Sequence, residues 1–266
     1  MRTRKIAHLR PDEILPELQA TPVAYLPFGL LEWHGPHLPL GVDSFNAEAI
    51  AVRAANQTGG LVMPTIYCGT ERERPPEVLD DLGFERDTWI VGMDFPHNSL
   101  PSMYASEEIF ALTVRENLRL TAAMGFKVLV VISGHAATNQ IETLRRIAAE
   151  FNAAGQVKVL VELPFVANAS GTLEVGHASR IETAVMLALE PESVRLKNLP
   201  PQSEPLNNTD FAIVDYDTFL GRPTPDRTVS AGDDPRRADA DAGERMMAQA
   251  AEQITRRVRR ALETIE

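Results

Sequence analysis

Residues 127–134 read KVLVVISG, and the apolar run over 127–132 is the most hydrophobic segment of the chain. Its β-branched residues and short length are typical of a central strand that is buried on both faces of a parallel sheet. Helices are predicted before and after it, over about 106–124 and about 139–154, and a further strand over 157–163. This alternation predicts an α/β fold in which a mainly parallel sheet is flanked by helices.

The N-terminal part of the chain shows the same alternation. Residues 23–28 (VAYLPF) predict a buried strand that opens into a loop at Gly29. We expect Ser44 to be the N-cap of a helix over about 45–57, and residues 61–67 to form the next strand. Two further helices are predicted over 181–189 and 238–264.

The composition is that of an ordinary globular protein, with 44% hydrophobic and 24% charged residues. At this length we expect one domain over 1–266. The net charge of −11 argues against a nucleic-acid partner, because binding to phosphate backbones needs clustered Lys and Arg. A single cysteine, Cys68, excludes an intrachain disulfide framework. Without a signal peptide or an apolar stretch of about 18 residues, we expect a cytoplasmic protein with no membrane partner.

A long connection over 70–101 is rich in charges and prolines. Connections of this length inside a domain are usually functional or disordered. This one also contains Phe84, Trp89 and Phe95, which a disordered linker would seldom carry. We therefore expect an ordered active-site loop.

Metal-binding residue types follow the first predicted strand. Glu32, His34, His37 and Asp43 fall within one short loop, and ligands of open parallel sheets bind at the carboxyl ends of the strands. Carboxylate and imidazole together suit Zn, Mn or Fe, and a bridging carboxylate can hold two such ions. The alternative is that these side chains only satisfy turns in the loop. His135 follows the central strand at the same sheet edge, which favours the metal site.

A third cluster lies at 176–183 (GHASRIET). His177 could be a helix cap or a general acid/base. Glu182 falls in the first turn of a predicted helix, where the helix dipole favours a carboxylate even without a function. The residues themselves leave both interpretations open.

Residues 32–43 (EWHGPHLPLGVD) closely resemble the E-x-H-G-x-H-L-P-L-G-T-D signature of the creatininase (creatinine amidohydrolase) family. Three later segments are similar to family features in the expected order: 133–135 (SGH) to an N-G-H turn, 176–183 to a G-H-A-G-x-x-E-T segment, and 232–235 (GDDP) to a late G-D-P-type loop. The resemblance extends over about 24–245, nearly the whole chain.

This resemblance implies a creatininase-like three-layer sandwich, a homohexamer and a site for two divalent metal ions, Zn and/or Mn, with Fe possible. Carried over by position, Glu32, Asp43 and His135 hold one ion, and His34 and Asp43 hold the other, so that Asp43 is the bridge. His177 matches the family's catalytic histidine. It is expected to pass a proton to the leaving group while activated water attacks the carbonyl carbon.

The sequence departs from the family pattern in three places. Creatininase has a second-metal glutamate two positions after the N-G-H histidine, where this chain has Ala137, and Glu182 is the candidate to replace it. Asn139 lies one place later than the asparagine of many members. The segment 68–76 does not resemble the substrate loop of creatininase, and its creatinine-stacking tryptophans have no clear match around 169–175, which argues against creatinine as the natural substrate.

Three functions are compatible with the sequence. The leading hypothesis is a metal-dependent hydrolase that opens a C–N amide bond, expected to be cyclic, in a small polar molecule. The first alternative is a C–C hydrolase of an oxidised inositol-type cyclic diketone, and the second is a non-catalytic metal-dependent small-molecule-binding protein. Arg72, Arg74 and His97 could contact substrate oxygens from the long loop, or could form surface ion pairs.

Overall fold

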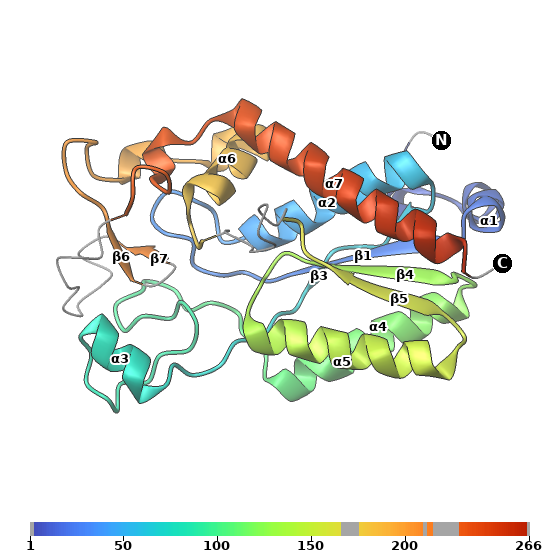
Figure 1. The fold of residues 1–266 in the computed structure, drawn as a ribbon, viewed down its shortest axis with the longest axis horizontal. Coiled ribbons are helices and arrows are strands. Elements are labelled where there is room, and N and C mark those ends of the chain that lie inside the picture. Colours follow the sequence, from blue (N-terminus) through green and yellow to red (C-terminus); the bar gives the residue numbers. More distant parts are fainter. Residues whose placement is uncertain (1–2, 166–175, 210–211, 215–228, 265–266) are drawn as a thin grey trace.

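A parallel sheet between two layers of helices forms the centre of the molecule (Figure 1). The computed structural model describes residues 3–165, 176–209, 212–214 and 229–264. The strand order is β2-β1-β4-β5, and β3 also pairs with β1. This architecture confirms the predicted α/β fold with a parallel sheet flanked by helices. The strands are β1 (Val23–Gly29), β2 (Leu61–Val62), β3 (Ile66–Tyr67), β4 (Val128–Ser133) and β5 (Lys158–Glu162), with a separate antiparallel pair of β6 (Asn207–Thr209) and β7 (Ala212–Val214).

Seven α-helices lie in the described part of the chain. They are α1 (Pro11–Ala20), α2 (Val42–Thr58), α3 (Pro76–Leu82), α4 (Glu107–Ala123), α5 (Thr138–Ala154), α6 (Arg180–Leu189) and α7 (Ala240–Leu262). Four short 3-10 helices accompany them: Ile6–His8, Pro191–Ser193, Leu196–Asn198 and Pro235–Arg237. No helix among the described residues has the length and apolar character needed to cross a membrane.

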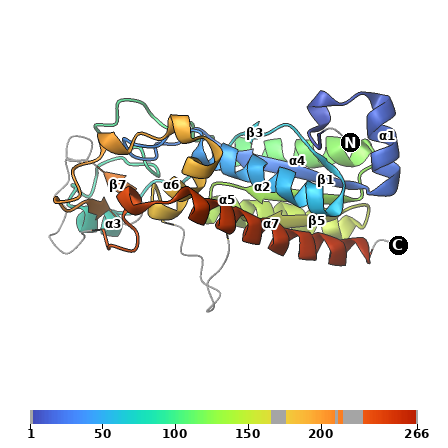
Figure 2. The same ribbon diagram turned by 90° about the horizontal axis from the view of Figure 1, so that it is seen from above.

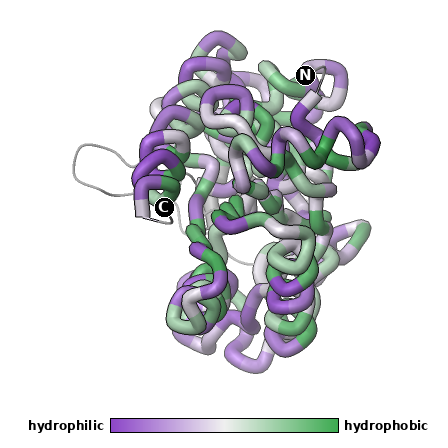
Figure 3. The backbone as a smooth tube through the Cα atoms, turned by 90° about the vertical axis from the view of Figure 1, so that its right-hand side faces the viewer, coloured by the Kyte–Doolittle hydropathy of each residue, from purple (hydrophilic) through white to green (hydrophobic). Residues whose placement is uncertain are grey.

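Side chains of β1 and β4 alternate between the two faces of the sheet, and both faces are buried. Tyr25 and Val130 point to the face covered by α2 and α7, whereas Leu26 and Val131 point to the face covered by α4 and α5. Figures 1 and 2 show these two helical layers. Burial on both sides explains why the strands are continuous apolar runs rather than alternating ones. Along α7, which ends near the C label, hydrophilic and hydrophobic parts of the tube alternate (Figure 3).

Two predicted boundaries are wrong. α2 begins at Val42 after Gly41, so Ser44 is not its N-cap and instead lies in the first turn, where its hydroxyl donates to the Leu30 carbonyl. The predicted strand over 61–67 is divided into β2 and β3, with Pro64 between them. Proline has no N–H to donate to a neighbouring strand, which accounts for the interruption.

The long connection over 70–101 is folded around a small core of its own. It contains α3, which was not predicted. Apolar side chains from α3 and from the segment after it form this core: Leu79, Leu82, Ile90, Met93 and Phe95, with Trp33, Val78 and Phe84 packed against them. Trp89 does not join the core and is exposed. The connection lies at the end of the molecule where the strands have their carboxyl ends, opposite α1 (Figure 1).

Candidate metal centre

The carboxyl ends of β1 and β4 bring three chain segments together. The strands are in register, with Phe28 opposite Ser133, and the Gly134 amide donates to the Phe28 carbonyl at 2.8 Å. The first turn of α2 lies directly against this point. A Cβ on Gly134 would be 2.0 Å from the backbone oxygen of Asp43, so only glycine permits this approach. The loop after β1, the turn after β4 and the start of α2 therefore share one location.

One group of possible ligands consists of Glu32, Asp43 and His135, all buried. His135 Nδ1 is 3.2 Å from Glu32 Oε2 and 3.4 Å from Asp43 Oδ2. The atoms that these residues offer lie within 4.8 Å of one another. This is the set that the family resemblance implies for one ion.

A second group consists of His34, Asp43 and Glu182, also buried. His34 Nε2 is 3.3 Å from Asp43 Oδ1 and 3.9 Å from Glu182 Oε1. Asp43 therefore directs one carboxylate oxygen towards each group. Ala137, which stands where creatininase has a glutamate, is at the wall of the adjoining cavity. Glu182 comes from α6 and supplies a carboxylate to the group that lacks this glutamate.

Several buried polar atoms in these groups have no hydrogen-bond partner. They are His34 Nε2, Asp43 Oδ2 and His135 Nε2. Buried polar atoms that stay unpaired are costly, and such atoms usually find a partner. The donor set combines carboxylates with imidazoles, which is the set that Zn, Mn and Fe accept. The residues present thus fit divalent metal ions and could hold two of them.

Burial and neighbouring charges shift the pKa values of these groups in opposite directions. Burial acts to raise the pKa of Asp43, but the imidazoles of His34 and His135 hold it well below its usual range. Burial acts to lower the pKa of His34, but the carboxylates of Asp43, Glu182 and Glu32 together outweigh it and raise the pKa to about 10. For Glu182, burial prevails and raises the pKa to about 8. The close contact of Asp43 with the imidazoles thus favours the charged forms of Asp43 and His34, whereas burial favours the neutral form of Glu182.

His177 lies beside these groups with a defined orientation. Its Nε2 is 2.5 Å from the Trp33 carbonyl, so this nitrogen donates and carries the proton. Its Nδ1 then has a free lone pair, 3.9 Å from Glu32 Oε2. The ring centroid is 4.2 Å from that of His34. Burial and the charge of His34 lower the pKa of His177 to about 4, so the imidazole is neutral at pH 7 and able to accept a proton.

Two orienting residues were missed by the sequence analysis. The Tyr104 hydroxyl donates to Glu32 Oε1. The amide of Ala178, which has a positive φ of 51°, donates to Glu182 Oε2 at 2.6 Å. Tyr104 comes from a segment far from Glu32 in the sequence, so no local pattern could have identified it. Each bond holds one carboxylate oxygen and leaves the other directed at the ligand groups.

A cavity of about 940 Å³ opens onto the centre. Glu32, Asp43, His135, His177 and Glu182 are at its wall, together with loop residues Glu71–Arg74 and, from the start of α5, Asn139.

The remaining candidates have other surroundings. Arg72 lies at the cavity wall and pairs with Glu107 at 3.1 Å, and Arg74 donates to the Gly92 carbonyl. His97 is exposed and does not line the cavity. His37 is buried, but its Nε2 faces Thr183 Oγ1 at 3.0 Å and it belongs to neither group of possible ligands. The segment 169–175, searched for tryptophan counterparts, lies outside the described residues.

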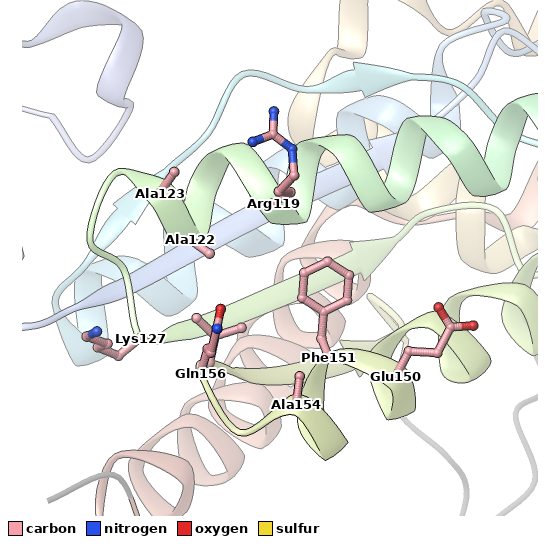
Figure 4. Close-up of a pocket in the computed structure, with 9 residues that line it drawn as sticks. Arg119, Ala122, Ala123, Lys127, Glu150, Phe151, Ala154 and Gln156 are labelled. Atoms are coloured by element: carbon pink, nitrogen blue, oxygen red, sulfur yellow. The ribbon is translucent and has the colours of Figure 1, made fainter.

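A second cavity, of about 680 Å³, lies at the opposite edge of the sheet, between α4, α5 and the starts of β4 and β5 (Figure 4). Its wall includes Arg119, Lys127, Glu150 and Phe151. None of its lining residues is among the buried side chains with unpaired polar atoms. It has no grouping of ligand-type side chains, so it is not a candidate metal centre.

Comparison with known proteins identifies the family of the chain. The family model "Creatininase: Creatinine amidohydrolase" matches residues 7–78 and 86–258. Creatinine amidohydrolase of Pseudomonas putida is 28% identical over 202 residues, which cover 69% of this chain and 71% of that protein.

Solved creatininase structures share the fold. One crystal structure of creatinine amidohydrolase is 24% identical, with 97% of each chain covered and a TM-score of 0.69. A glutamate-to-glutamine variant of creatininase, of the Zn-Zn type, is 25% identical with 98% of each chain covered and the same TM-score. A manganese form is 24% identical, covers 97% of this chain and 98% of that one, and has a TM-score of 0.66. The chain therefore belongs to the creatininase family, and its homologues in that family are metal-dependent amidohydrolases.

Proposed function

We propose that the protein is a metal-dependent hydrolase that cleaves a C–N amide bond, expected to be cyclic, in a small polar molecule. The observation that carries the proposal is the position of Asp43, whose two carboxylate oxygens face two different groups of buried ligand-type atoms. A shared carboxylate of this kind is what a two-metal site requires. Membership of the creatininase family supports the same reaction class.

The proposed ligands are Glu32, Asp43 and His135 for one ion, and His34, Asp43 and Glu182 for the other. The ions are Zn and/or Mn, with Fe also compatible with the donors. Related solved structures of a Zn-Zn type and of a Mn form support this choice. When bound, such ions supply Lewis acidity and make water a nucleophile near neutral pH.

His177 is the proposed catalytic residue. Its Nε2–H is held by the Trp33 carbonyl, so Nδ1 is the atom that can accept a proton at the centre and release it to the leaving nitrogen. The low pKa keeps this nitrogen unprotonated before the reaction. Tyr104 and Ala178 keep Glu32 and Glu182 in place through the cycle, because each donates to the carboxylate oxygen that faces away from the other ligands.

A second candidate reaction is hydrolysis of a C–C bond in an oxidised inositol-type cyclic diketone. The observation that favours it is the set of arginines at the cavity wall: Arg72, Arg74 and Arg145. Guanidinium groups are good donors to hydroxyl and carbonyl oxygens of a polar ring. The products separate the two reactions: opening a cyclic amide gives one molecule with a new amine and a new carboxylate, whereas opening a cyclic diketone gives one molecule with a new carboxylate and no new amine.

Homo-oligomerisation, with a hexamer as the specific expectation, is also a proposal. It is supported by large apolar side chains exposed on α4 and just before it: Leu100, Met103, Ile109, Leu112, Leu120 and Met124. Apolar surface gathered on one element is typical of an interface. The mass in solution tests this, and a monomeric mass would contradict it. A cytoplasmic location, the single-domain boundaries over 1–266 and the absence of a nucleic-acid partner stay predictions.

Metal content is the first test of the proposed function. The protein is purified without chelators as wild type, as Asp43→Ala and as Asp87→Ala, which removes an exposed aspartate of the long loop. Elemental analysis should give about two transition-metal ions per chain for the wild type and Asp87→Ala, and a loss of ions for Asp43→Ala. A wild type without metal would contradict the metal-dependent function, and two ions retained by Asp43→Ala would remove the bridging role.

A further inference from the structure

The two ring nitrogens of His135 have different surroundings. Its Nδ1 faces Glu32 and Asp43, so this nitrogen is the one available to an ion. Its Nε2 points the other way, is buried, and makes no hydrogen bond. An imidazole that binds a metal through one nitrogen carries a proton on the other, and that N–H usually has an acceptor.

Glu71 is the acidic side chain nearest to this nitrogen. Its Oε2 is 3.9 Å from His135 Nε2, and its other oxygen, Oε1, accepts from the Arg72 amide at 2.8 Å. Among the ion pairs of the described residues, Glu71 pairs with His135. The guanidinium of the neighbouring Arg72 pairs with Glu107 and Glu142 instead. Glu71 is therefore free to act on His135 rather than to neutralise an arginine.

The chain around Glu71 is fixed to the chain around His135. The Thr70 amide donates to Gln140 Oε1 at 2.8 Å, and the Gln140 amide group donates to Ser133 Oγ at 2.9 Å. Gln140 is fully buried, so it connects the two segments rigidly.

Gly92 packs closely against the side chain of Glu71. A Cβ at Gly92 would be 2.7 Å from Glu71 Cγ and 2.4 Å from the Tyr104 hydroxyl, and Gly92 itself has a φ of +53°. The glycine thus lets the side chains of Glu71 and Tyr104 lie next to each other. One directs a carboxylate at His135, and the other donates to Glu32.

We propose that Glu71 is a positioning residue, which accepts a hydrogen bond from His135 Nε2–H and so holds the Nδ1 lone pair towards Glu32 and Asp43. The two heavy atoms need to approach by about 1 Å to reach normal hydrogen-bond length. A carboxylate in this position fixes the tautomer and ring orientation of a metal-binding histidine and raises its basicity. The inference rests on the proposed metal-dependent function and adds a residue to it.

Glu73 provides the matched control. It belongs to the same loop and also lines the cavity, but among the described residues the carboxylates that pair with His135 are Glu32, Asp43 and Glu71, and not Glu73. The set to compare is wild type, Glu71→Ala, Glu71→Gln and Glu73→Ala. The glutamine variant keeps an oxygen that can accept from Nε2–H, so it separates loss of the hydrogen bond from loss of the charge.

The measurement is the affinity for Zn²⁺ alone, by competition with a chelator, together with the absorption spectrum of the Co²⁺-substituted protein. Glu71→Ala should bind one of the ions about 10- to 100-fold more weakly and change the Co²⁺ spectrum. Glu71→Gln should recover part of the affinity, and Glu73→Ala should stay within about 2-fold of wild type. Thermal unfolding of the metal-free forms shows whether each variant is folded.

The outcomes separate this inference from the proposed function. If the wild type binds ions and Glu71→Ala binds them equally well, or if Glu73→Ala loses as much affinity, the role of Glu71 is overturned and the metal-dependent function stands. A wild type that binds no Zn²⁺ would overturn both.

Discussion

At its carboxyl edge the sheet opens into a cavity of about 940 Å³, and at its amino edge α4 and α5 border another of about 680 Å³. Both walls carry charged side chains. At the amino edge these are exposed and paired, as in Arg119 with Glu116 and Glu150 with Arg115. At the carboxyl edge Glu32, Asp43 and Glu182 are buried.

The difference between the two edges shows that burial of charged side chains, and not their presence alone, marks a functional centre. Exposed ion pairs contribute little and place few demands on the fold. Buried carboxylates and imidazoles whose polar atoms lack partners destabilise the folded protein. Such groups are expected where a bound ligand supplies the missing partner. Cavity size alone would not have separated the two edges. The predictions below test this contrast between the edges, beginning with the largest effect.

Removal of the proposed proton carrier should have the largest effect. His177→Ala should lower kcat by about 10²- to 10⁴-fold, because its imidazole is neutral, donates from Nε2 to the Trp33 carbonyl and leaves Nδ1 to carry the proton. Steady-state kinetics on a cyclic amide or diketone that the wild type hydrolyses provides the measurement. His97→Ala, at an exposed position outside the cavity, should leave kcat unchanged.

The metal content of His177→Ala gives an additional criterion. It should equal that of the wild type, because His177 is proposed to move a proton and not to hold an ion. Unchanged activity would remove the catalytic role. A loss of one ion would instead make His177 a ligand, in the grouping with Glu32 and His34 that the geometry also permits.

Glycines at the two edges provide the next comparison. Gly134 lies at the carboxyl end of β4, and an added Cβ would collide with the Asp43 backbone; Gly155 lies before β5, has a φ of +72°, and has no neighbour within 4 Å of such a Cβ. Gly134→Ala should therefore destabilise the protein by about 3 kcal/mol and displace Asp43 from the centre. Gly155→Ala should cost about 1 kcal/mol of backbone strain and keep both ions.

Urea unfolding and elemental analysis of the two glycine variants check this prediction. The result that contradicts it is a Gly134→Ala protein with full metal content, because Asp43 would then tolerate displacement of its backbone. Equal stability losses for the two variants would mean that the Asp43 backbone moves away from the added Cβ at little cost, which also contradicts the prediction.

The sequence was sufficient to predict β1, β4 and β5, because these strands are short apolar runs. The sequence-based predictions were wrong where contacts between distant segments determine where a helix begins. α2 begins before Ser44 since Gly29 and Gly134 allow its first turn to lie on the strand ends. α3 had local signals in Pro75, Pro76 and a left-handed Gly83, which the charged character of the loop obscured.

The residues of the candidate site likewise divide into those that a sequence motif identifies and those that only the structure identifies. Glu32, His34 and Asp43 share one short segment, so their motif could be recognised directly. Tyr104 and Glu71 reach the centre only because a distant loop folds over it. No periodicity or motif connects these positions, and their roles depend on the direction of single oxygen atoms, which the three-dimensional structure determines.

The smallest expected effect is on the pH dependence of the free energy of unfolding. It is tested with one glutamate at each edge of the sheet, Glu162 and Glu150. Burial raises the pKa of Glu162, at the end of β5, to about 7, although Arg257 at 2.9 Å opposes the shift. Between pH 4.5 and 7 the folded protein therefore holds a proton that the unfolded chain releases, so the free energy of unfolding falls as the pH rises. Glu162→Gln should remove about 1.5 kcal/mol of this fall between pH 5.5 and 7.

Glu150 at the amino edge is the control for this prediction, because its arginine partner lowers its pKa instead of raising it. Glu150→Gln should leave the decline between pH 5.5 and 7 unchanged, since its carboxyl is ionised in both states over that range. Urea unfolding at several pH values gives the difference between each variant and wild type, in which contributions from bound metal cancel. If Glu162→Gln keeps the full slope, Arg257 holds this carboxylate ionised in the folded protein, and the buried negative charge at the carboxyl edge extends beyond the metal centre.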